Sequence, residues 1–480
     1  MPGVRFSSRP AKKVENDESP KTPLRSEDDH APAQRDAASR RFVILTKDFT
    51  ALGWADGLDR QGEEVYVATD YENEDEPEQR KRMEKVGDGW LQVLTVDEAL
   101  KTLQSPNTYW IFGENCFPEA AKTLLDTGQK VFPKSIELGE QMEHERDLGV
   151  DIATDAGLTP PKTYEFSDRD DALSIMEQHP DQAFVLKLND NKFNYMTLVP
   201  VRKEDADAHE EVENYLKYME GECGDGILQE RIKIEDALEV CVELWYYEGR
   251  AFMATCGLEV KRKNTYDIGE MCGCGGDFAF VIPMDCQLVK LTMAKMDSFY
   301  QEQKYTGLAD MNVIFTPDDK PHFLEVCNRF GYNFHPDLFL ALGKDTFGNI
   351  IADYVDGYVE TIPDRFDQEN IGCSLTLFLD HPREGLPVHV DTLREDSFYP
   401  FDGFKKNTQL LLTGYSDEVG IFVGKGESIE SAWKNVSEAI AFDEAVSFPD
   451  MYYRWDLAED NYYNAPVLRY NELKKRGLIP

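Results

Sequence analysis

A carboxylate, an amide and a guanidinium follow one another in the stretch Leu324-Glu325-Val326-Cys327-Asn328-Arg329-Phe330-Gly331. The apolar residues before it predict a strand, and Gly331 allows the backbone to turn away at its end. Carboxylate and amide oxygens bind hard cations such as Mg²⁺, and a guanidinium holds phosphoryl oxygens as a bidentate fork. The stretch therefore predicts a magnesium–triphosphate site, with Glu325 and Asn328 as metal ligands and Arg329 as a catalytic contact to phosphate. The alternative is an ordinary hairpin with a charged tip.

A partner strand is expected upstream, in the run from Tyr305 to Phe315. Asp310 and Asn312 lie two residues apart in this run, so that their side chains share one face of the strand. We expect Asp310 or Asn312 to lie beside Glu325 as a further metal ligand.

The composition narrows the classes of partner. The chain has 480 residues, which allows about three domains, and its 91 acidic against 51 basic side chains leave a formal charge of -40. Such a charge repels the phosphate backbone, so nucleic acid is not expected as a partner. No apolar run reaches the roughly 18 residues of a membrane span, and no membrane association is expected.

The nine cysteines are odd in number and scattered, and only Cys272 and Cys274 lie close together. A metal site at this Cys-Gly-Cys is the alternative to reduced thiols, but no second pair stands at zinc-finger spacing. Reduced thiols and a cytoplasmic location are expected.

The chain divides into four segments. Residues 1–40 are rich in Pro, Ser and charged residues and predict a disordered tail. Short apolar strands alternate with helical patterns over 41–135, which predicts a doubly wound α/β domain. The segment 136–365 contains the stretches described above, and 366–480 begins with a strand and predicts a small β-rich domain. In this last segment the pattern from Ser428 to Ala441 predicts an amphipathic helix.

Several residues on predicted strands suit a nucleotide. Lys187 ends the apolar strand Phe184-Val185-Leu186-Lys187-Leu188, where a buried ammonium needs an anion, and we expect it to contact ATP phosphates. Gln229 and Glu230 end another apolar strand and are expected at an adenine edge. Glu239, or alternatively Glu235, is expected to accept hydrogen bonds from the ribose hydroxyls. A snorkelling lysine at a strand edge is the alternative for Lys187.

A basic cluster, Lys261-Arg262-Lys263, precedes a glycine-dense loop at Cys272-Gly273-Cys274-Gly275-Gly276. Glycines permit close approach of the backbone to a ligand, and positive charge is scarce in this chain. We expect the cluster to contact a ligand, with Lys263 as a catalytic residue.

In this order, these elements resemble an ATP-grasp enzyme, most closely the phosphoribosylamine–glycine ligases of purine synthesis. The stretch Met142-Glu143-His144-Glu145-Arg146 is similar to the segment that carries the family's first phosphate-binding lysine, with Arg146 in its place. The loop from Asp267 to Gly275 resembles the family's Asp-x-Gly-x-x-Thr-Gly-Gly-Met-Gly loop, and the C-terminal Tyr453-Arg454-Trp455-Asp456 its Tyr-Arg-x-Asp strand. The resemblance implies a two-lobed ATP-grasp module over 136–365, between a pre-ATP-grasp domain and the C-terminal domain.

The chain also departs from the family. The N-terminal Gly-x-Gly-Gly-Arg-Glu-His-Ala turn is replaced by the residues from Leu45 to Gly53, and the glycine-rich flap by Asn189 to Asn194, which has no glycine. Glu-x-Asn-x-Arg has become Glu325-Val326-Cys327-Asn328-Arg329, so the amide is displaced by one residue. Asn333 and Phe334 stand where the family has Pro and Glu, which predicts a less acidic, more apolar acceptor side.

The resemblance implies an ATP- and Mg²⁺- (or Mn²⁺-) dependent carboxylate–amine ligase that acts through an acyl phosphate. Its partners would be a small-molecule carboxylate and an amine, with substrates altered from those of the family, in a monomer or homodimer. The alternative is a protein that keeps the fold for binding or structure and has lost catalysis.

Overall fold

The computed structural model describes residues 40–71, 74, 76–189, 197–202, 204–219, 223–232, 237–460, 462 and 465–480, without the side chains of His144 and Arg146. The predictions for the tail before residue 40, for the flap at residues 190–194 and for Glu235 as the alternative ribose contact lie outside the described residues. Residues 39–480 form one compact unit. No helix in the described ranges is long and apolar enough to cross a membrane.

The N-terminal part is a five-stranded parallel sheet, as the alternation of strands and helices predicts. Its strand order is β3-β2-β1-β4-β5. These strands are β1 (Arg41–Leu45), β2 (Glu64–Thr69), β3 (Gln92–Thr95), β4 (Thr108–Phe112) and β5 (Lys130–Phe132). The connecting helices are α1 (Leu52–Arg60), α2 (Pro77–Met83), α3 (Val96–Thr102) and α4 (Pro118–Asp126). The carboxyl ends of β1 and β4, which are neighbours in this sheet, face the site described below.

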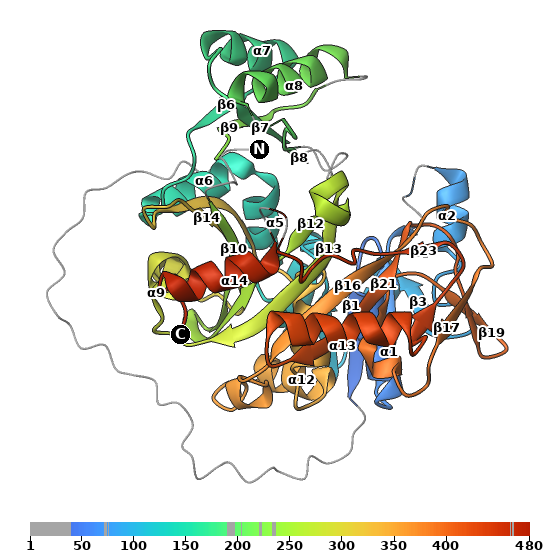
Figure 1. Ribbon diagram of the computed structural model, residues 1–480. Helices are drawn as coiled ribbons and strands as arrows, with labels where there is room; N and C mark the ends of the chain where they lie inside the picture. The colour runs from blue at the N-terminus through green and yellow to red at the C-terminus, as the bar shows by residue number, and fades with distance from the viewer. Residues whose placement is uncertain are drawn as a thin grey trace, which may run out of the picture. The chain divides into compact units, whose positions relative to one another are not determined.

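A small antiparallel sheet carries three of the predicted nucleotide contacts, Lys187, Gln229 and Glu230. It has the order β6-β9-β7-β8 and consists of β6 (Thr163–Phe166), β7 (Phe184–Leu188), β8 (Thr197–Leu198) and β9 (Gly226–Glu230). Helices α7 (Arg169–Gln178) and α8 (Asp205–Tyr218) lie together on this lobe, and apolar side chains of both pack against the strands (Figure 1).

A ten-stranded sheet forms the largest layer. Its path is β15-β14-β10-β11-β13-β16-β21-β18, with β12 paired to β13 and β23 to β16. The first members are β10 (Leu238–Tyr247), β11 (Arg250–Gly257), β12 (Val260–Asn264), β13 (Ile268–Ile282), β14 (Gly307–Phe315) and β15 (Pro321–Cys327). The others are β16 (Ile371–Leu379), β18 (Phe398–Pro400), β21 (Glu418–Gly426) and β23 (Met451–Tyr452). Because β13 pairs with β16, the sheet continues without a break across the boundary proposed at residue 365.

The remaining elements complete the layers. A four-stranded sheet contains β17 (Pro387–Val390), β19 (Phe404–Lys406), β20 (Gln409–Leu411) and β22 (Val446–Ser447). The predicted amphipathic helix is present as α13 (Ile429–Ala441), which the side chain of Ser428 caps, and it lies along β16 and β21 (Figure 1). The other helices are α9 (Gln287–Leu291), α10 (Asp297–Glu302), α11 (Phe334–Pro336), α12 (Phe347–Asp356) and α14 (Pro466–Lys475).

One detail differs from the sequence pattern. A single helix is predicted from about Leu138 to Ala156, but the chain forms α5 (Ile136–His144) and α6 (Arg146–Asp155). The break lies at Glu145, whose φ of -90° and ψ of 83° are not helical. The last turn of α5 lies beside β15, where Glu143 Oε1 is 3.6 Å from Cys327 Sγ.

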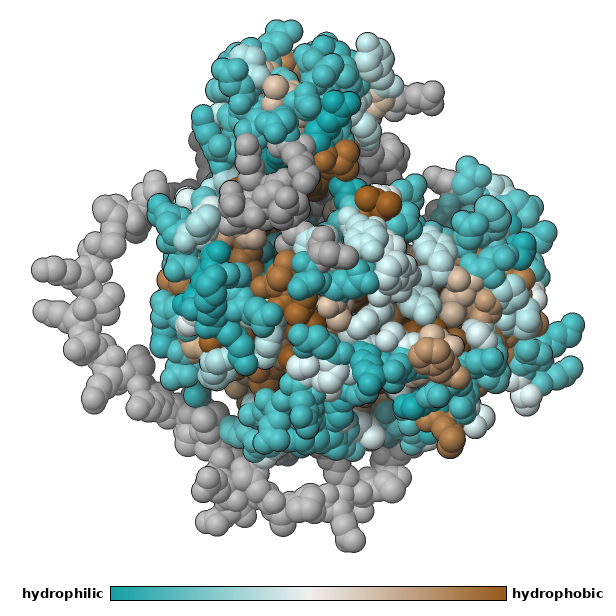
Figure 2. Space-filling model, viewed as in Figure 1, coloured by the Kyte–Doolittle hydropathy of each residue, from teal (hydrophilic) through white to brown (hydrophobic). Residues whose placement is uncertain are grey.

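An aromatic core joins the N-terminal sheet to the rest of the unit. Trp54 of α1 stacks on Phe347 of α12 at 4.3 Å between ring centroids and meets Tyr399 of β18 edge-on at 4.7 Å. The parallel sheet is therefore held against the large sheet by buried rings rather than by a flexible linker. Figure 2 shows hydrophilic residues over most of the face viewed, in keeping with the formal charge of -40.

Candidate functional site

One cavity of about 1200 Å³ collects most of the residues that the sequence singles out. Its wall comes from β7 and β9 of the small sheet, from β10, β12, β14 and β15 of the large sheet, from α5, and from the carboxyl ends of β1 and β4. The predicted site residues that line it are Lys187, Gln229, Glu230, Glu239, Asp310, Asn312, Glu325 and Arg329. Lys263 and Asn328 lie elsewhere, and the side chain of Arg146 is outside the described part of the chain.

Strands β14 and β15 pair antiparallel, as expected, and bring the acidic and amide side chains together. Asn312 lies opposite Glu325, and Asp310 lies opposite Cys327. All four line the cavity. The two-residue period therefore placed Asp310 and Asn312 correctly on one face.

The position of Asn328 corrects its predicted role as a metal ligand. Its side chain is 1% exposed, its Oδ1 accepts a hydrogen bond from Tyr300 Oη at 2.8 Å, and its Nδ2 lies 3.5 Å from Met142 Sδ. Successive side chains of a strand point to opposite faces, so Cys327 and not Asn328 faces the cavity beside Glu325. The amide of Asn328 therefore makes its contacts inside the protein core and not in the cavity.

Arg329 lies in the cavity wall, but its fork is occupied by Glu143 of α5. Arg329 Nη2 lies 2.6 Å from Glu143 Oε1, and Nε lies 2.9 and 3.0 Å from the two carboxylate oxygens. Burial alone disfavours the guanidinium charge, but Glu143 outweighs it and holds the pKa of Arg329 well above its ordinary value. The sequence pattern of this segment assigns a role only to Arg146. It does not identify Glu143 as the partner of Arg329.

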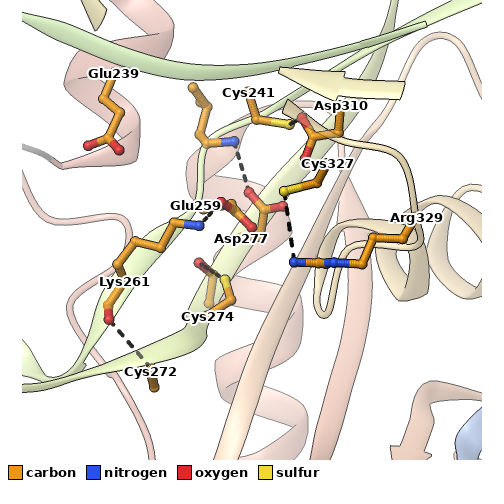
Figure 3. A network of polar contacts seen from close by, with 12 residues as sticks. Glu239, Cys241, Glu259, Lys261, Cys272, Cys274, Asp277, Asp310, Cys327 and Arg329 are labelled. Carbon is orange, nitrogen blue, oxygen red and sulfur yellow. Dashed lines mark hydrogen bonds and ion pairs between the residues drawn. The ribbon is translucent and has the colours of Figure 1, made fainter. Parts of the chain in front are cut away.

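The basic cluster supplies the cavity with Lys261 rather than Lys263. Lys261 Nζ lies 2.5 Å from Glu259 Oε2 (Figure 3). Burial disfavours the ammonium, but Glu259 and Glu325 together raise the pKa of Lys261 well above its ordinary value. The Lys261 cation thus faces the carboxylates of the candidate metal site.

The structure corrects the prediction that Lys263 is a catalytic residue. Its Nζ is ion-paired with Asp417 and lies 5.6 Å from the centre of the Phe378 ring, outside the cavity. The pairing of β12 with β13 is irregular on both sides of Arg262, so simple alternation along β12 does not place Lys261 and Lys263 alike. The sequence shows the basic cluster, but it does not show that Lys261 rather than Lys263 lies in the cavity.

The small sheet contributes three of the predicted nucleotide contacts, and the large sheet contributes a fourth. Lys187 is 6% exposed, and its Nζ lies 3.4 Å from the carbonyl oxygen of Leu324, so β7 reaches across to β15. Gln229 and Glu230 end β9 in the same wall. Glu239 enters from β10, where burial raises the pKa of its carboxyl group although Arg469 and Lys261 oppose the shift.

The donor set suits a hard cation held jointly with phosphates. Glu325 and Asn312 present oxygen ligands from adjacent strands, which is the chemistry that Mg²⁺ prefers. Asp310 accepts a hydrogen bond from Cys241 Sγ at 2.6 Å, and burial, with Glu259 and Glu243 nearby, raises the pKa of its carboxyl well above the ordinary value. No group of three His, Cys, Asp or Glu within the described ranges forms a metal cage. A cation here would take its other ligands from phosphate and water.

The far end of the cavity differs from the sequence prediction. Asn333 and Phe334 were expected to make the acceptor side apolar, but each is 1% exposed and lies in the core, where Asn333 Nδ2 donates to Ser374 Oγ at 3.1 Å. The residues that form this end instead come from α5 and the carboxyl ends of β1 and β4, and they include Asp48, Glu114 and Glu140. Asn333 and Phe334 therefore do not line the cavity, and the prediction that they shape its acceptor side is wrong.

The thiols near the cavity are unpaired. All nine cysteines are free, and Cys272 and Cys274 make weak contacts to backbone carbonyl oxygens of Lys261 and Gly276 at 3.6 and 3.2 Å (Figure 3). Burial raises the pKa of Cys272 to about 12, which makes it a poor thiolate ligand.

Comparisons with known proteins find the fold but no sequence family. No protein-family model matches the chain, and no curated protein does. Among solved structures, a phosphoribosylamine–glycine ligase from Thermotoga maritima matches with a TM-score of 0.62 and 18% identity, covering 87% of this chain and 99% of that one.

Two further solved structures share the architecture. The biotin carboxylase domain of a 2-oxoglutarate carboxylase from Hydrogenobacter thermophilus, solved with MgADP and bicarbonate, has a TM-score of 0.58 and 11% identity over 92% of this chain and 99% of that one. An L-amino acid ligase from Bacillus licheniformis has a TM-score of 0.53 and 14% identity over 85% and 98% of the two chains. The predicted ATP-grasp fold is confirmed by these similarities.

Proposed function

We propose that this protein is an ATP- and Mg²⁺- (or Mn²⁺-) dependent ligase that joins a carboxylate to an amine through an acyl phosphate. The observation that carries the proposal is the convergence of eight predicted site residues on one cavity of about 1200 Å³ between the small and large sheets. The solved structures that share the fold include a phosphoribosylamine–glycine ligase and an L-amino acid ligase.

The cavity residues would divide the work as follows. Gln229, Glu230 and Glu239 would hold the adenosine, while Lys187 and Lys261 would neutralise phosphate charge. Glu325 and Asn312 would hold the metal, which supplies charge neutralisation on the transferring phosphoryl group when bound.

The protein contributes position and charge rather than a covalent nucleophile. ATP phosphorylates the carboxylate and leaves as ADP. The amine nitrogen then attacks the acyl carbon, a C–N bond forms, and the C–O bond to phosphate breaks. Phosphate leaves with the electron pair and takes up the proton that the nitrogen loses.

Binding of Mg·ATP to the full chain tests the proposal. Thermal stabilisation by millimolar Mg·ATP is expected for the wild type and is expected to be lost in Glu325→Ala. Glu302→Ala, at the exposed end of α10, is the matched control and should keep the stabilisation. A wild type that shows no stabilisation would refute nucleotide binding.

A second candidate is a nucleotide-binding protein without catalysis. The observation in its favour is that Cys327 faces the cavity where the resembling enzymes carry an asparagine, which removes one hard oxygen ligand. Mg·ATP binding without ADP formation, across a panel of carboxylates and amines, would support this candidate over the ligase.

A further inference from the structure

The peptide bond between Phe330 and Gly331 is held at both of its polar groups. Its carbonyl oxygen accepts a hydrogen bond from Nη1 of Arg329 at 3.0 Å, and its N–H group donates to Nδ1 of His335 at 2.6 Å. The peptide lies in the irregular turn that follows β15, and Arg329 and Gly331 both line the cavity. Two side chains therefore fix a backbone group that no helix or strand would otherwise fix.

The bond to Gly331 decides which nitrogen of His335 carries the proton. A backbone N–H can only donate, so Nδ1 accepts and has no hydrogen of its own. The hydrogen of the neutral ring is then on Nε2, which lies 2.9 Å from Oε2 of Glu243. This contact is not ideally aligned, and neither of its two atoms forms a hydrogen bond with another described residue. Glu243 thus favours the tautomer that Gly331 requires.

Glu243 is itself anchored through its second carboxylate oxygen. Oε1 accepts hydrogen bonds from Oγ1 of Thr255 at 3.0 Å and from Nε1 of Trp245. Glu243 and Trp245 belong to β10, and Thr255 lies opposite Glu243 on β11. All three side chains are fully buried. The carboxylate that faces His335 is therefore oriented by two neighbouring strands of the large sheet.

Aromatic rings hold the imidazole in place. His335 is fully buried in α11 and meets Phe330 and Phe334 edge-on, at 5.1 and 5.3 Å between ring centroids. Rotation of the imidazole would break these contacts as well as the hydrogen bond to Gly331.

Two cavity residues flank the clamped peptide. Arg329 precedes it and Tyr332 follows it, and Cζ of Arg329 lies 5.4 Å from the centre of the Tyr332 ring. Tyr332 also packs so closely on Gly273 that a Cβ atom there would lie 3.1 Å from the ring. A shift of the Phe330–Gly331 peptide would therefore displace two side chains of the cavity wall.

Arg329 retains one donor for a ligand. Of the five N–H groups of its guanidinium, one on Nε and one on Nη2 contact Glu143, and one on Nη1 contacts the carbonyl oxygen of Phe330. The second N–H on Nη2 lies toward Sγ of Cys327, with Nη2 and Sγ 3.9 Å apart (Figure 3). The fifth, on Nη1, makes no hydrogen bond to a described residue. Because Arg329 is 17% exposed and lines the cavity, this N–H can meet an anionic oxygen of a bound ligand.

We propose, on the basis of the ligase function proposed above, that His335 is a positioning residue for the nucleotide site. Through the Phe330–Gly331 peptide it holds Arg329 where the fifth N–H meets a phosphate oxygen of bound Mg·ATP. Glu243 holds His335 in the tautomer that this requires. His335 and Glu243 touch no ligand themselves, because both are fully buried outside the cavity lining. Such supporting contacts lock the orientation of a binding group before the ligand arrives.

Calorimetric titration of the full chain with Mg·ATP tests this role in two variants that each keep one half of His335. Asparagine places an oxygen near the position of Nδ1 and can still accept from Gly331, whereas glutamine places its amide near Nε2 and does not reach Gly331. We expect His335→Gln to raise the Kd for Mg·ATP about fivefold, the effect of about one neutral hydrogen bond, and His335→Asn to stay within about twofold. His381→Gln, at an exposed histidine outside the cavity, is the control and should bind like the wild type.

Stability separates positioning from a purely structural role. Each His335 variant leaves one buried group without its partner, so both should unfold at a lower urea concentration than the wild type. A structural histidine would weaken nucleotide binding in both variants as stability falls, whereas a positioning histidine weakens it only where Gly331 loses its acceptor. In the background of Arg329→Lys, His335→Gln should change the Kd by less than about twofold, because the guanidinium that His335 positions is gone.

Hydrogen exchange covers the case in which a His335 variant does not fold. The Gly331 amide hydrogen of the wild-type chain, observed by NMR with isotope-labelled glycine, should exchange at least about 10³-fold more slowly than in an unfolded chain. Rapid exchange, wild-type affinity in His335→Gln, an equal loss in both variants, or an undiminished effect beside Arg329→Lys overturns the positioning role alone. Absence of Mg·ATP binding to the wild type overturns the ligase function and this role with it.

Discussion

Replacement of Lys261 by methionine tests whether the cavity cation is Lys261 rather than Lys263. Methionine keeps most of the packing of the lysine stem but removes the charge that lies 2.5 Å from Glu259 and close to Glu325. The side chains of Lys261 and Glu259 are 29% and 11% exposed, so the pair is partly screened by solvent. We expect Lys261→Met to lower the free energy of unfolding by about 2 kcal/mol, less than the 3–5 kcal/mol typical of a fully buried broken pair.

Lys261→Met should weaken Mg·ATP binding more than the removal of a solvent-exposed lysine would. A hydrogen bond between an ammonium and a phosphate contributes about 1.5–3 kcal/mol, which corresponds to about a 10- to 100-fold rise in the Kd for Mg·ATP. Urea unfolding measures the first quantity, and calorimetric titration with Mg·ATP measures the second.

The matched control is Lys263→Met, two residues along the same strand. Lys263 has its own ion pair with Asp417, so this variant should lose stability while its affinity for Mg·ATP stays within about twofold of the wild type. If Lys261→Met binds Mg·ATP like the wild type, or if both variants lose affinity equally, the assignment of Lys261 to the phosphate site is refuted.

Three further predictions concern charges in and around the cavity. Glu143→Gln leaves the Arg329 guanidinium without its carboxylate and should lower the free energy of unfolding in urea by about 2–3 kcal/mol, whereas the exposed Glu137→Gln should change it by less than about 0.5 kcal/mol. The pKa of Glu114 is raised from 4.5 to about 8, so between these pH values the folded state holds a proton that the unfolded state has lost, and this group lowers the free energy of unfolding as pH rises through that window. Glu114→Gln should therefore show a weaker dependence of stability on pH from about 4.5 to about 8. A slope equal to that of the wild type would contradict the raised pKa of Glu114. Arg454→Met leaves the fully buried Asp456 and the partly exposed Asp267 without their guanidinium partner and should cost about 3–5 kcal/mol in the same urea assay, while a loss below about 1 kcal/mol would show that the network is not stabilising.

The sequence by itself determined the fold and most of the cavity. Alternation along Tyr305–Phe315 places Asp310 and Asn312 on one face, and the apolar run before Glu325 ends in the strand that pairs with them. The same reasoning placed Lys187 and Gln229 at the ends of buried strands. These successes share a cause, because the direction of a side chain on a regular strand follows from its position along the chain alone.

The tertiary structure alone decided which charges meet. Arg329 pairs with Glu143, 186 residues away, and Glu114 accepts a hydrogen bond from Thr46, 68 residues away. Local periodicity carries no information about such partners, since they depend on how separate sheets and helices pack. The same limit applies to Lys261, because irregular pairing along β12 alters the simple alternation that a sequence pattern assumes.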